Sequence, residues 1–290
     1  MSATASSGPT GPTGATGSGG STSGNAPTFA PLPAIMHPSI LSAARDTAAM
    51  VGRNLTVLRR VPQMLVFSLI QPMIFVLLFR YVFGGAIKIP GYRYVDYLMP
   101  GIFTETVAFG AINTAVGLAE DRGKGLLERL RSLPMSRAAV LGGRTLADTV
   151  RNVLIIIIIT LIGFLVGFRV HAGLGAFAIG LLVLLLFGFA LSWLFAFIGL
   201  SVPNGESAQA AAFPLLAPLV FASSAFVDPS QMPKWLAWWA RNQPVSATVN
   251  AVRATASGGP LAAKVLIAVA WSVGIVVVLA PLAVRRYRTA

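Results

Sequence analysis

Charged side chains are scarce in this chain of 290 residues, since Asp, Glu, Lys and Arg make up only 11% of it. Soluble domains carry about 25%. Hydrophobic residues reach 55%, and the mean hydropathy is +0.75. This composition excludes an ordinary soluble domain and predicts an integral membrane protein.

Cysteine is absent, and histidine occurs only at His37 and His171. The absence of thiols excludes disulfides, thiol catalysis and thiolate metal sites, and two isolated histidines do not make a His-rich metal site. We therefore expect no metal site on this chain.

Acidic residues are outnumbered, because 22 Lys and Arg face 9 Asp and Glu, which gives a net charge of +13. On a soluble protein this excess would favour nucleic acid as a partner. On a membrane protein it is typical of cytoplasmic loops, so we expect membrane lipid as a partner and no nucleic acid.

Residues 1–36 consist mainly of Ser, Thr, Gly, Pro and Ala, and no charged residue precedes Arg45. Such a segment buries too little apolar surface to offset its ordering entropy, so we predict a disordered, low-complexity tail. It lacks the basic start and compact apolar stretch of a secretory signal. We expect the tail to stay in the cytoplasm.

Residues 37–60 predict an amphipathic helix, because apolar residues from Leu41 to Leu58 recur at close to a 3.6-residue period. We expect it to lie along the cytoplasmic membrane surface. The alternative is a simple soluble extension of the first span. Its basic residues are Arg45, Arg53, Arg59 and Arg60.

Six apolar stretches approach the roughly 20 residues needed to cross a membrane. The chain from 61 to 290 is therefore predicted to be an all-α domain of six transmembrane helices. Pro214 and Pro218 interrupt the fifth stretch, which neighbouring helices can tolerate. The expected spans are about 61–83, 97–118, 148–168, 174–200, 209–227 and 261–284.

The basic residues predict the orientation of the spans. Fourteen of the 22 lie before the first span, between residues 122 and 151, or after the last span, and the other eight lie on the opposite side. Because cytoplasmic loops carry the excess of Lys and Arg, both termini are expected in the cytoplasm.

The largest predicted cytoplasmic connection, residues 119–147, begins with a charged turn containing glycine and continues as a short amphipathic helix that Pro134 ends. Such a helix could dock into a groove on a partner. The alternative is a basic loop whose leucines rest on lipid. The residues in question are Glu120, Asp121, Arg122, Gly123, Gly125, Leu126, Leu127, Glu128, Arg129 and Leu130.

Three tryptophans lie within five residues between the fifth and sixth stretches, at Trp235, Trp238 and Trp239. Indoles prefer the membrane interface. Prolines break the backbone just before them, so we expect one or two short helices that dip into the outer leaflet. The alternative is a plain aromatic belt.

Glu105 lies within the second span, where a carboxylate is costly and normally faces a partner or a wet cavity. It could also reach water at the outer end. On the same helix, Thr106, Gly110, Asn113 and Gly117 fall along one face, which favours close helix packing.

Two runs of sequence resemble a known family. The run VGLAEDRGKGLLERLRSLPMSRAAVLGGRTLAD (116–148) is similar to the second cytoplasmic loop of ABC-2-type transporter permeases of the daunorubicin/doxorubicin-resistance branch. The run SSAFVDPSQMPKWLAWWARNQPVSATVNAVRA (223–254) is similar to that family's outer segment, with Gln243-Pro244 where Asn-Pro is usual. The likeness covers roughly residues 41–288.

The resemblance implies a permease subunit of an ATP-driven exporter of hydrophobic or amphipathic compounds such as drugs, antibiotics or lipids. Two such subunits, identical or homologous, would associate in the plasma membrane, and two separate ATPase subunits would bind ATP and magnesium. This chain would carry no cofactor and no ATPase site of its own, which agrees with its lack of a phosphate-binding G-x-x-x-x-G-K motif followed by Ser or Thr.

The resemblance also implies roles for particular residues. The connection from Glu120 to Pro134 would be a coupling helix, and the amphipathic helix before the first span would be a second contact with the ATPase. Glu105, Gln71, Phe109 and Asn113 would line the substrate path. The outer gate would comprise Phe226, Pro229, Met232, Pro233, Trp235 and Pro244.

Other function classes fit less well. A secondary transporter or channel should show internal repeats or several charges within its spans, and Glu105 is the main candidate found. A polysaccharide-exporting permease of the same family is a closer variant. An intramembrane enzyme would need Ser with His, or paired acids, inside the spans, and the sequence offers neither.

Overall fold

The computed structural model describes residues 47–49, 51–52, 56, 62–84, 93–126 and 137–289. All of them lie in one compact unit, residues 37–290. Every regular element within these ranges is helical. The elements are α2 (Pro62–Leu77), η1 (Leu78–Phe83, a stretch of π-helix), α3 (Tyr94–Gly123), α5 (Arg137–Val166), α6 (Leu174–Gly199), α7 (Gly205–Phe221), η2 (Pro229–Gln231), α8 (Lys234–Arg241), α9 (Pro244–Ser257) and α10 (Leu261–Thr289).

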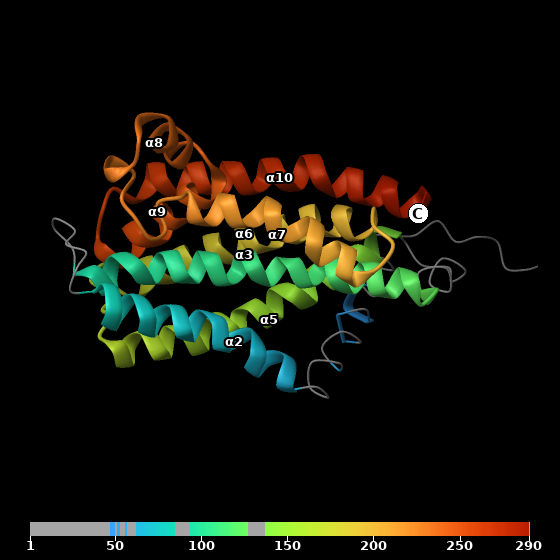
Figure 1. The fold of residues 1–290 in the computed structure, drawn as a ribbon, viewed down its shortest axis with the longest axis horizontal. Coiled ribbons are helices and arrows are strands. Elements are labelled where there is room, and N and C mark those ends of the chain that lie inside the picture. Colours follow the sequence, from blue (N-terminus) through green and yellow to red (C-terminus); the bar gives the residue numbers. More distant parts are fainter. Residues whose placement is uncertain are drawn as a thin grey trace, which may run out of the picture. The chain divides into compact units, whose positions relative to one another are not determined.

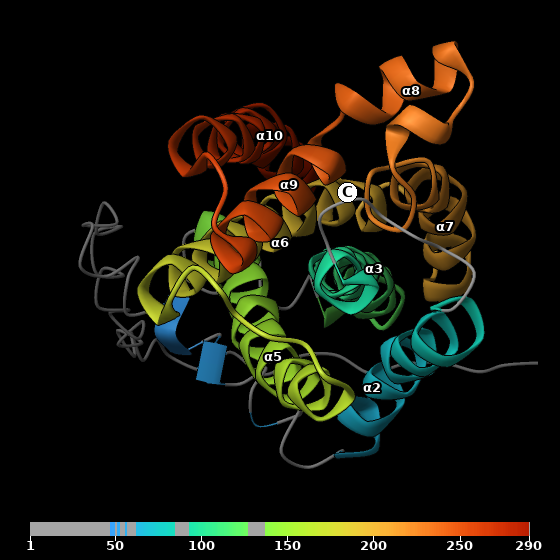
Figure 2. The same ribbon diagram turned by 90° about the vertical axis from the view of Figure 1, so that its left-hand side faces the viewer.

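Six long elements run alternately up and down the bundle: α2 with η1, α3, α5, α6, α7 and α10 (Figure 1). The short helices α8 and α9 lie at the end where α3 begins, which we call the α8 end. The other end, where α3 and α10 finish, is the α10 end. Figure 2 shows α3 surrounded by α2, α5, α6 and α7, and α3 packs against each of them and against α9.

Glycines allow α3 to lie at the centre. A Cβ on Gly199 of α6 would meet the backbone of Ala115 in α3, and a Cβ on Gly101 of α3 would meet the backbone of Ala225. Small residues at such crossings let helix backbones approach closely. The result is that most of α3 is buried, whereas α10 is largely exposed along its apolar length.

Helix lengths bear on the predicted spans. Four helices in the described part of the chain are long and apolar enough to cross a membrane: Tyr94–Gly123, Val140–Val166, Leu174–Gly199 and Leu261–Tyr287. A shorter apolar stretch, Val66–Val82, corresponds to the first predicted span. α7 has 17 residues and corresponds to the fifth. The six-span count therefore stays a prediction.

Several helices begin or end one or more turns away from the predicted spans. The third span was expected from residue 148, but α5 begins at Arg137. The charged turn was expected from Glu120, but α3 continues through Gly123, and the chain turns at Lys124 and Gly125. Gly125 has a φ of 67°, a left-handed conformation that favours glycine.

The fifth predicted span, 209–227, is also displaced, since α7 runs from Gly205 to Phe221. Asn204 caps its start, accepting a hydrogen bond from the backbone N–H of Ser207 at 2.8 Å. Phe226 consequently lies beyond the helix.

The predicted tail, residues 1–36, lies outside the described residues. Of the predicted amphipathic helix, the structure describes six residues as helical, 47–49, 51–52 and 56. Its basic residues Arg45, Arg53, Arg59 and Arg60 lie outside the described residues, so their role stays a prediction.

Polar contacts tie the helices together at both ends. At the α8 end, Asp96 accepts hydrogen bonds from Arg93 (2.9 Å) and from the backbone N–H of Arg169 (3.0 Å). At the α10 end, Asp121 pairs with Arg144 (2.9 Å), and Arg122 donates to the carbonyl of Leu200 (3.0 Å). These contacts fix the register of α3 against α5 and α6.

We predict that Gly199→Ala destabilises the protein, because its Cβ would force the backbones of α6 and α3 apart. Overpacking of this kind typically costs about 1–3 kcal/mol. Thermal unfolding of the detergent-solubilised chain, followed by tryptophan fluorescence, should show a lower midpoint.

The matched control is Gly274→Ala in α10, where a Cβ would meet nothing within 4 Å. It should leave the midpoint unchanged or raise it slightly, since Ala favours helix over Gly. Equal midpoints for Gly199→Ala and the unmodified protein would contradict the close packing of α3 and α6.

Candidate functional site

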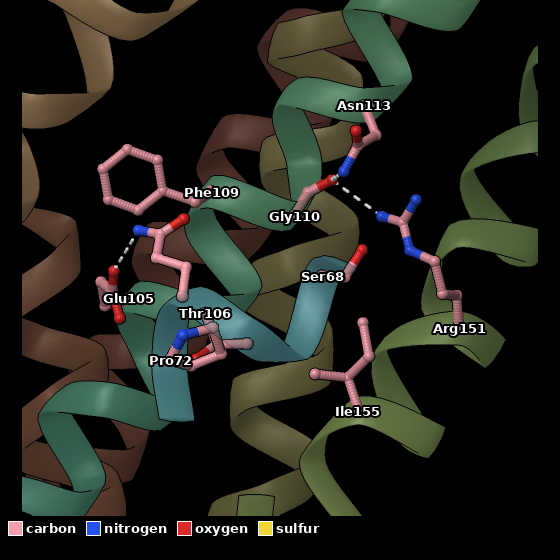
Figure 3. Close-up of a pocket in the computed structure, with 10 residues that line it drawn as sticks. Ser68, Pro72, Glu105, Thr106, Phe109, Gly110, Asn113, Arg151 and Ile155 are labelled. Carbon is pink, nitrogen blue, oxygen red and sulfur yellow. Dashed lines mark hydrogen bonds between the residues drawn. The ribbon is translucent and has the colours of Figure 1, made fainter. Parts of the chain in front are cut away.

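A small cleft of about 80 Å³ lies where α2, α3 and α5 meet (Figure 3). α3 contributes residues one helical turn apart, which brings them to one side of the helix. Pro72 interrupts α2 at the same place. The lining residues are Ser68, Gln71, Pro72, Glu105, Thr106, Phe109, Gly110, Asn113, Arg151 and Ile155.

Glu105 is the most deeply buried acidic residue of the cleft, with 1% of its surface exposed. Its Oε1 accepts a hydrogen bond from Nε2 of Gln71 at 2.9 Å. Its Oε2 is buried and has no hydrogen-bond partner among the described residues. An unsatisfied buried carboxylate oxygen is costly, so this atom marks a place where a further group could bind.

The four residues predicted to line a substrate path, Glu105, Gln71, Phe109 and Asn113, all line this cleft. The ring of Phe109 also lies against α7, with centroids 5.9 Å from Phe213 and 6.3 Å from Phe221. The structure thus brings the four together, while their part in transport stays a prediction.

Two charged residues near the start of the predicted third span lie at the cleft or beside it: Arg151 lines it, and Asp148 pairs with Arg151. Arg151 was counted among the loop cations, but it is the middle of α5, where it pairs with Asp148 (3.3 Å) and donates to the carbonyl of Gly110 (2.8 Å). Asp148 also accepts a hydrogen bond from Thr114 of α3 at 2.5 Å. The i, i+3 spacing of opposite charges could have signalled this pair.

The correction matters for the orientation, because Arg151 no longer counts as a loop residue. The remaining cations assigned to the cytoplasmic side still outnumber those on the other side, thirteen to eight. The excess of basic residues on that side therefore still predicts the same orientation.

The residues predicted for the coupling connection are only partly described. Leu127, Glu128, Arg129, Leu130 and Pro134 lie outside the described residues. Leu126 packs at the edge of an apolar cluster at the α10 end, which includes Leu118, Leu141 and Tyr287.

The polar residues of that connection have partners within the chain. Asp121 pairs with Arg144, and both side chains are 21% exposed. Arg122 donates to the carbonyls of Leu200 and Val202. Glu120 is more exposed and bonds Lys124 at 3.3 Å, and Gly123 is exposed beside it. Glu120, Gly123 and Lys124 are thus the exposed residues in the described part of this connection.

The predicted gate residues divide into two groups. Phe226 is buried and stacks on Phe79 with ring centroids 5.0 Å apart, next to Phe75 and Phe221. These four rings join η1 and α2 to α7 at the α8 end.

The other predicted gate residues lie away from that aromatic cluster. Pro229 opens η2, and Met232 and Pro233 connect it to α8. Trp235 is 73% exposed on α8, which lies at the periphery of the bundle (Figure 2), and Pro244 opens α9.

Asp228 caps η2 in this segment by accepting a hydrogen bond from the backbone N–H of Ser230 at 2.8 Å. That bond, helped by the Ser230 side chain, holds the pKa of Asp228 below its usual value. The carboxylate is therefore charged at neutral pH and keeps the cap in place.

Arg253 is a buried residue that the sequence reasoning assigned only to an outer loop. Its guanidinium lies 3.7 Å from the ring centroid of Tyr97 and donates to the carbonyls of Tyr97 (3.1 Å) and Ser224 (2.8 Å). It thereby holds α9 to α3 and to the segment after α7. A single Arg in an apolar helix gives no sequence signal for these partners.

Within the described ranges, no three His, Cys, Asp or Glu side chains gather closely enough to hold a metal ion. The cleft offers hydrogen bonding, apolar contact, the carboxyl group of Glu105 and the guanidinium of Arg151.

Comparisons with known proteins identify similar sequences. Residues 45–256 match the family model described as ABC-2 type transporter. The chain is 32% identical over 251 residues to the daunorubicin resistance ABC transporter permease protein DrrB1 of Streptomyces coeruleorubidus, covering 87% of this chain and 89% of that one.

Two more distant relatives share the same region. A Mycobacterium tuberculosis protein named as a doxorubicin resistance ABC transporter permease, DrrC, is 28% identical over 225 residues, covering 75% and 79% of the two chains. A transport permease of Cyanophora paradoxa, ycf38, is 26% identical over 213 residues, covering 72% and 73%.

We predict that Asp148 and Arg151 stabilise the bundle only as a pair. Asp148→Asn or Arg151→Gln alone would leave one largely buried charge without its partner, at a cost of about 3–5 kcal/mol. The double variant removes both charges, so it should lose much less than the sum of the two single losses. Unfolding by SDS titration in mixed micelles would measure the four free energies. Additive losses would show that the two charges do not stabilise each other.

Proposed function

The chain belongs to the ABC-2 type transporter family, and from this premise we propose that it exports hydrophobic or amphipathic compounds, such as drugs, antibiotics or lipids, from the cytoplasm or inner leaflet. It is the transmembrane permease subunit of an ABC exporter, as its likeness to drug-resistance permeases indicates. A permease subunit of this family works with an ATPase partner.

Six spans are proposed for the subunit, formed by α2 with η1, α3, α5, α6, α7 and α10. Their alternating direction supports this number, because each crossing reverses the chain (Figure 1). Two permease subunits would associate with two ATPase subunits, which would bind ATP and magnesium. The complex would lie in the plasma membrane with both permease termini in the cytoplasm.

The cleft beside Glu105 is proposed as part of the substrate route. The observation that carries this proposal is the buried Oε2 of Glu105, which has no partner among the described residues while apolar side chains such as Phe109 and Ile155 line the same cleft. The polar group of an amphipathic compound could bond the carboxylate oxygen, and its apolar part could pack against these apolar side chains. An ionisable residue inside a membrane bundle is a functional candidate by default.

The ATPase contact is proposed at the α10 end of the bundle. Asp121 and Arg122 hold the end of α3 to α5 and to the segment after α6, so they would transmit movement within the permease. The exposed Glu120 and Gly123 would contact the ATPase directly. The amphipathic helix before the first span would add a second contact.

The outer gate is proposed at the stacked rings of Phe226, Phe79, Phe75 and Phe221. These rings join α2 and η1 to α7, so separating them would open the α8 end of the bundle. The exposed tryptophans of α8 would sit in the outer membrane interface.

The experiment that tests the function is an ATPase assay on the complex. The permease would be co-expressed with its cognate ATPase, purified together with it and reconstituted in nanodiscs, and a panel of hydrophobic compounds would be added. Stimulated ATP hydrolysis supports export. Ion flux through the permease alone, with no ATPase retained, would support a secondary transporter or channel instead.

We predict that Glu120→Lys weakens retention of the ATPase subunit, because it reverses the charge of an exposed acidic residue at the end of α3. In the unmodified protein Lys124 pairs with Glu120. The variant therefore also replaces an ion pair with two neighbouring cations. The measurement is the ratio of ATPase to permease after affinity purification, together with ATP hydrolysis by the complex.

The matched control is Lys234→Glu, a charge reversal at an exposed residue of α8 at the opposite end. It should retain the ATPase at the unmodified ratio. Equal loss in both variants would indicate general damage, and normal retention with Glu120→Lys would remove Glu120 from the contact.

A further inference from the structure

Several oxygen atoms of the cleft accept no hydrogen bond from the residues that the structure describes. Nε2 of Gln71 donates to Glu105 (2.9 Å), and Nδ2 of Asn113 donates to the carbonyl of Gly110 (3.2 Å). Each of these amides therefore still offers its carbonyl oxygen. The Oε2 of Glu105 is a third acceptor without a partner among the described residues.

Arg151, the basic residue of the cleft, forms no ion pair with Glu105. Arg151 is paired with Asp148 in its own helix, and its Nη2 donates to the carbonyl of Gly110. Its Nε is buried and has no hydrogen-bond partner among the described residues. Figure 3 shows Arg151 reaching in from α5 on one side of the cleft and Glu105 on the opposite side. Glu105 thus has no ion-pair partner among the residues that the structure describes.

The size and lining of the cleft limit what can enter it. A volume of about 80 Å³ admits a small polar group but not a drug-sized body. Gln71 and Asn113 are exposed at its margin, whereas Glu105 is buried. A ligand would therefore place a small head beside Glu105 and leave its hydrophobic body outside, against Phe109 and the apolar surface of α2.

We propose that this cleft binds the protonated primary or secondary amine of an amphiphile, with N–H groups donating to Oε2 of Glu105 and to the carbonyl oxygens of Gln71 and Asn113. An ammonium group supplies both the missing positive charge and the missing donors. A quaternary ammonium supplies charge but no N–H, and a neutral alcohol supplies one donor but no charge. This inference deepens the proposed function and rests on it, because it names the class of compound that the substrate route accepts.

Amines of this class have two sources. One is a free amphiphilic amine, and the other is the head group of phosphatidylethanolamine, a membrane lipid with a primary ammonium. Phosphatidylcholine carries a quaternary ammonium and serves as the reference lipid.

The absence of native cysteine provides a direct binding assay. Ser68→Cys places a single thiol in the lining of the cleft. Its alkylation by N-ethylmaleimide would be followed by intact mass spectrometry in phosphatidylcholine nanodiscs, with dodecylammonium, dodecyltrimethylammonium or dodecanol as probes. Ser230→Cys, exposed on η2, is the matched control for partitioning of the probes into the lipid.

Dodecylammonium should protect the thiol at residue 68 at roughly tenfold lower concentration than dodecyltrimethylammonium or dodecanol, as expected for charge-assisted hydrogen bonds. None of the probes should protect the thiol at residue 230. Equal protection by dodecylammonium and dodecyltrimethylammonium would overturn the proposal, and so would no protection by any probe.

Glu105→Gln in the Ser68→Cys background should abolish the preference for dodecylammonium. The amide has nearly the shape of the carboxylate and can still accept the hydrogen bond from Gln71. Glu206→Gln, which removes an exposed carboxylate at the start of α7, should leave the preference unchanged. A preserved preference in Glu105→Gln would overturn the assignment. If that variant does not fold, the comparison of the three probes on the Ser68→Cys protein still decides.

A second arm distinguishes the two sources. Nanodiscs containing phosphatidylethanolamine would protect the thiol without any added probe if the lipid head group binds, and would not do so if only free amines enter. The test is also separate from the proposed function. Compounds that stimulate ATP hydrolysis equally with or without N–H groups would leave export intact and remove the ammonium site.

Discussion

The central position of α3 is the constraint on which the rest of the structure depends. Its backbone lies against Gly199 of α6 and against Ala225 after α7, too close for a Cβ at Gly199 or at Gly101. A membrane interior offers no hydrophobic driving force between helices, so close packing and hydrogen bonds must hold them. The glycines supply the packing, and the ion pairs and caps at both ends supply the hydrogen bonds.

The polar groups of α3 also supply hydrogen-bond partners to charged side chains of the surrounding helices. Thr114 of α3 satisfies Asp148 of α5, and Arg151 is satisfied in part by Gly110 of α3. Within the described residues Glu105 receives one hydrogen bond, from Gln71 of α2. Of the four long helices around α3, α2 packs against it least, and Pro72 interrupts the backbone hydrogen bonds of α2. The unsatisfied carboxylate therefore lies at the most loosely packed side of α3, where a ligand could approach.

The sequence predicted much of the candidate site, but not its partners. Glu105 stood out because a carboxylate in an apolar stretch is costly, and the family resemblance placed Gln71 on the same substrate path. Neither observation could show that the two side chains meet, since they are 34 residues apart on different helices. Arg151 was counted at the cytoplasmic end of the third span because the span was expected from residue 148, whereas α5 begins eleven residues earlier and places Arg151 in its middle. Arg253 was underestimated because its partners, Tyr97 and Ser224, come from distant segments.

The sequence by itself determined the class of the protein: scarce charge, long apolar stretches and two family-like runs are properties of the chain that need no folding to be seen. The first apolar stretch also gave α2 and η1 to within one residue at each end, because hydrophobicity follows the length of a helix. Only the tertiary structure decided which charges are paired and which is not, because pairing depends on which helix faces lie together. That is why Asp121 is committed to Arg144, while Glu105 keeps one oxygen without a partner among the described residues.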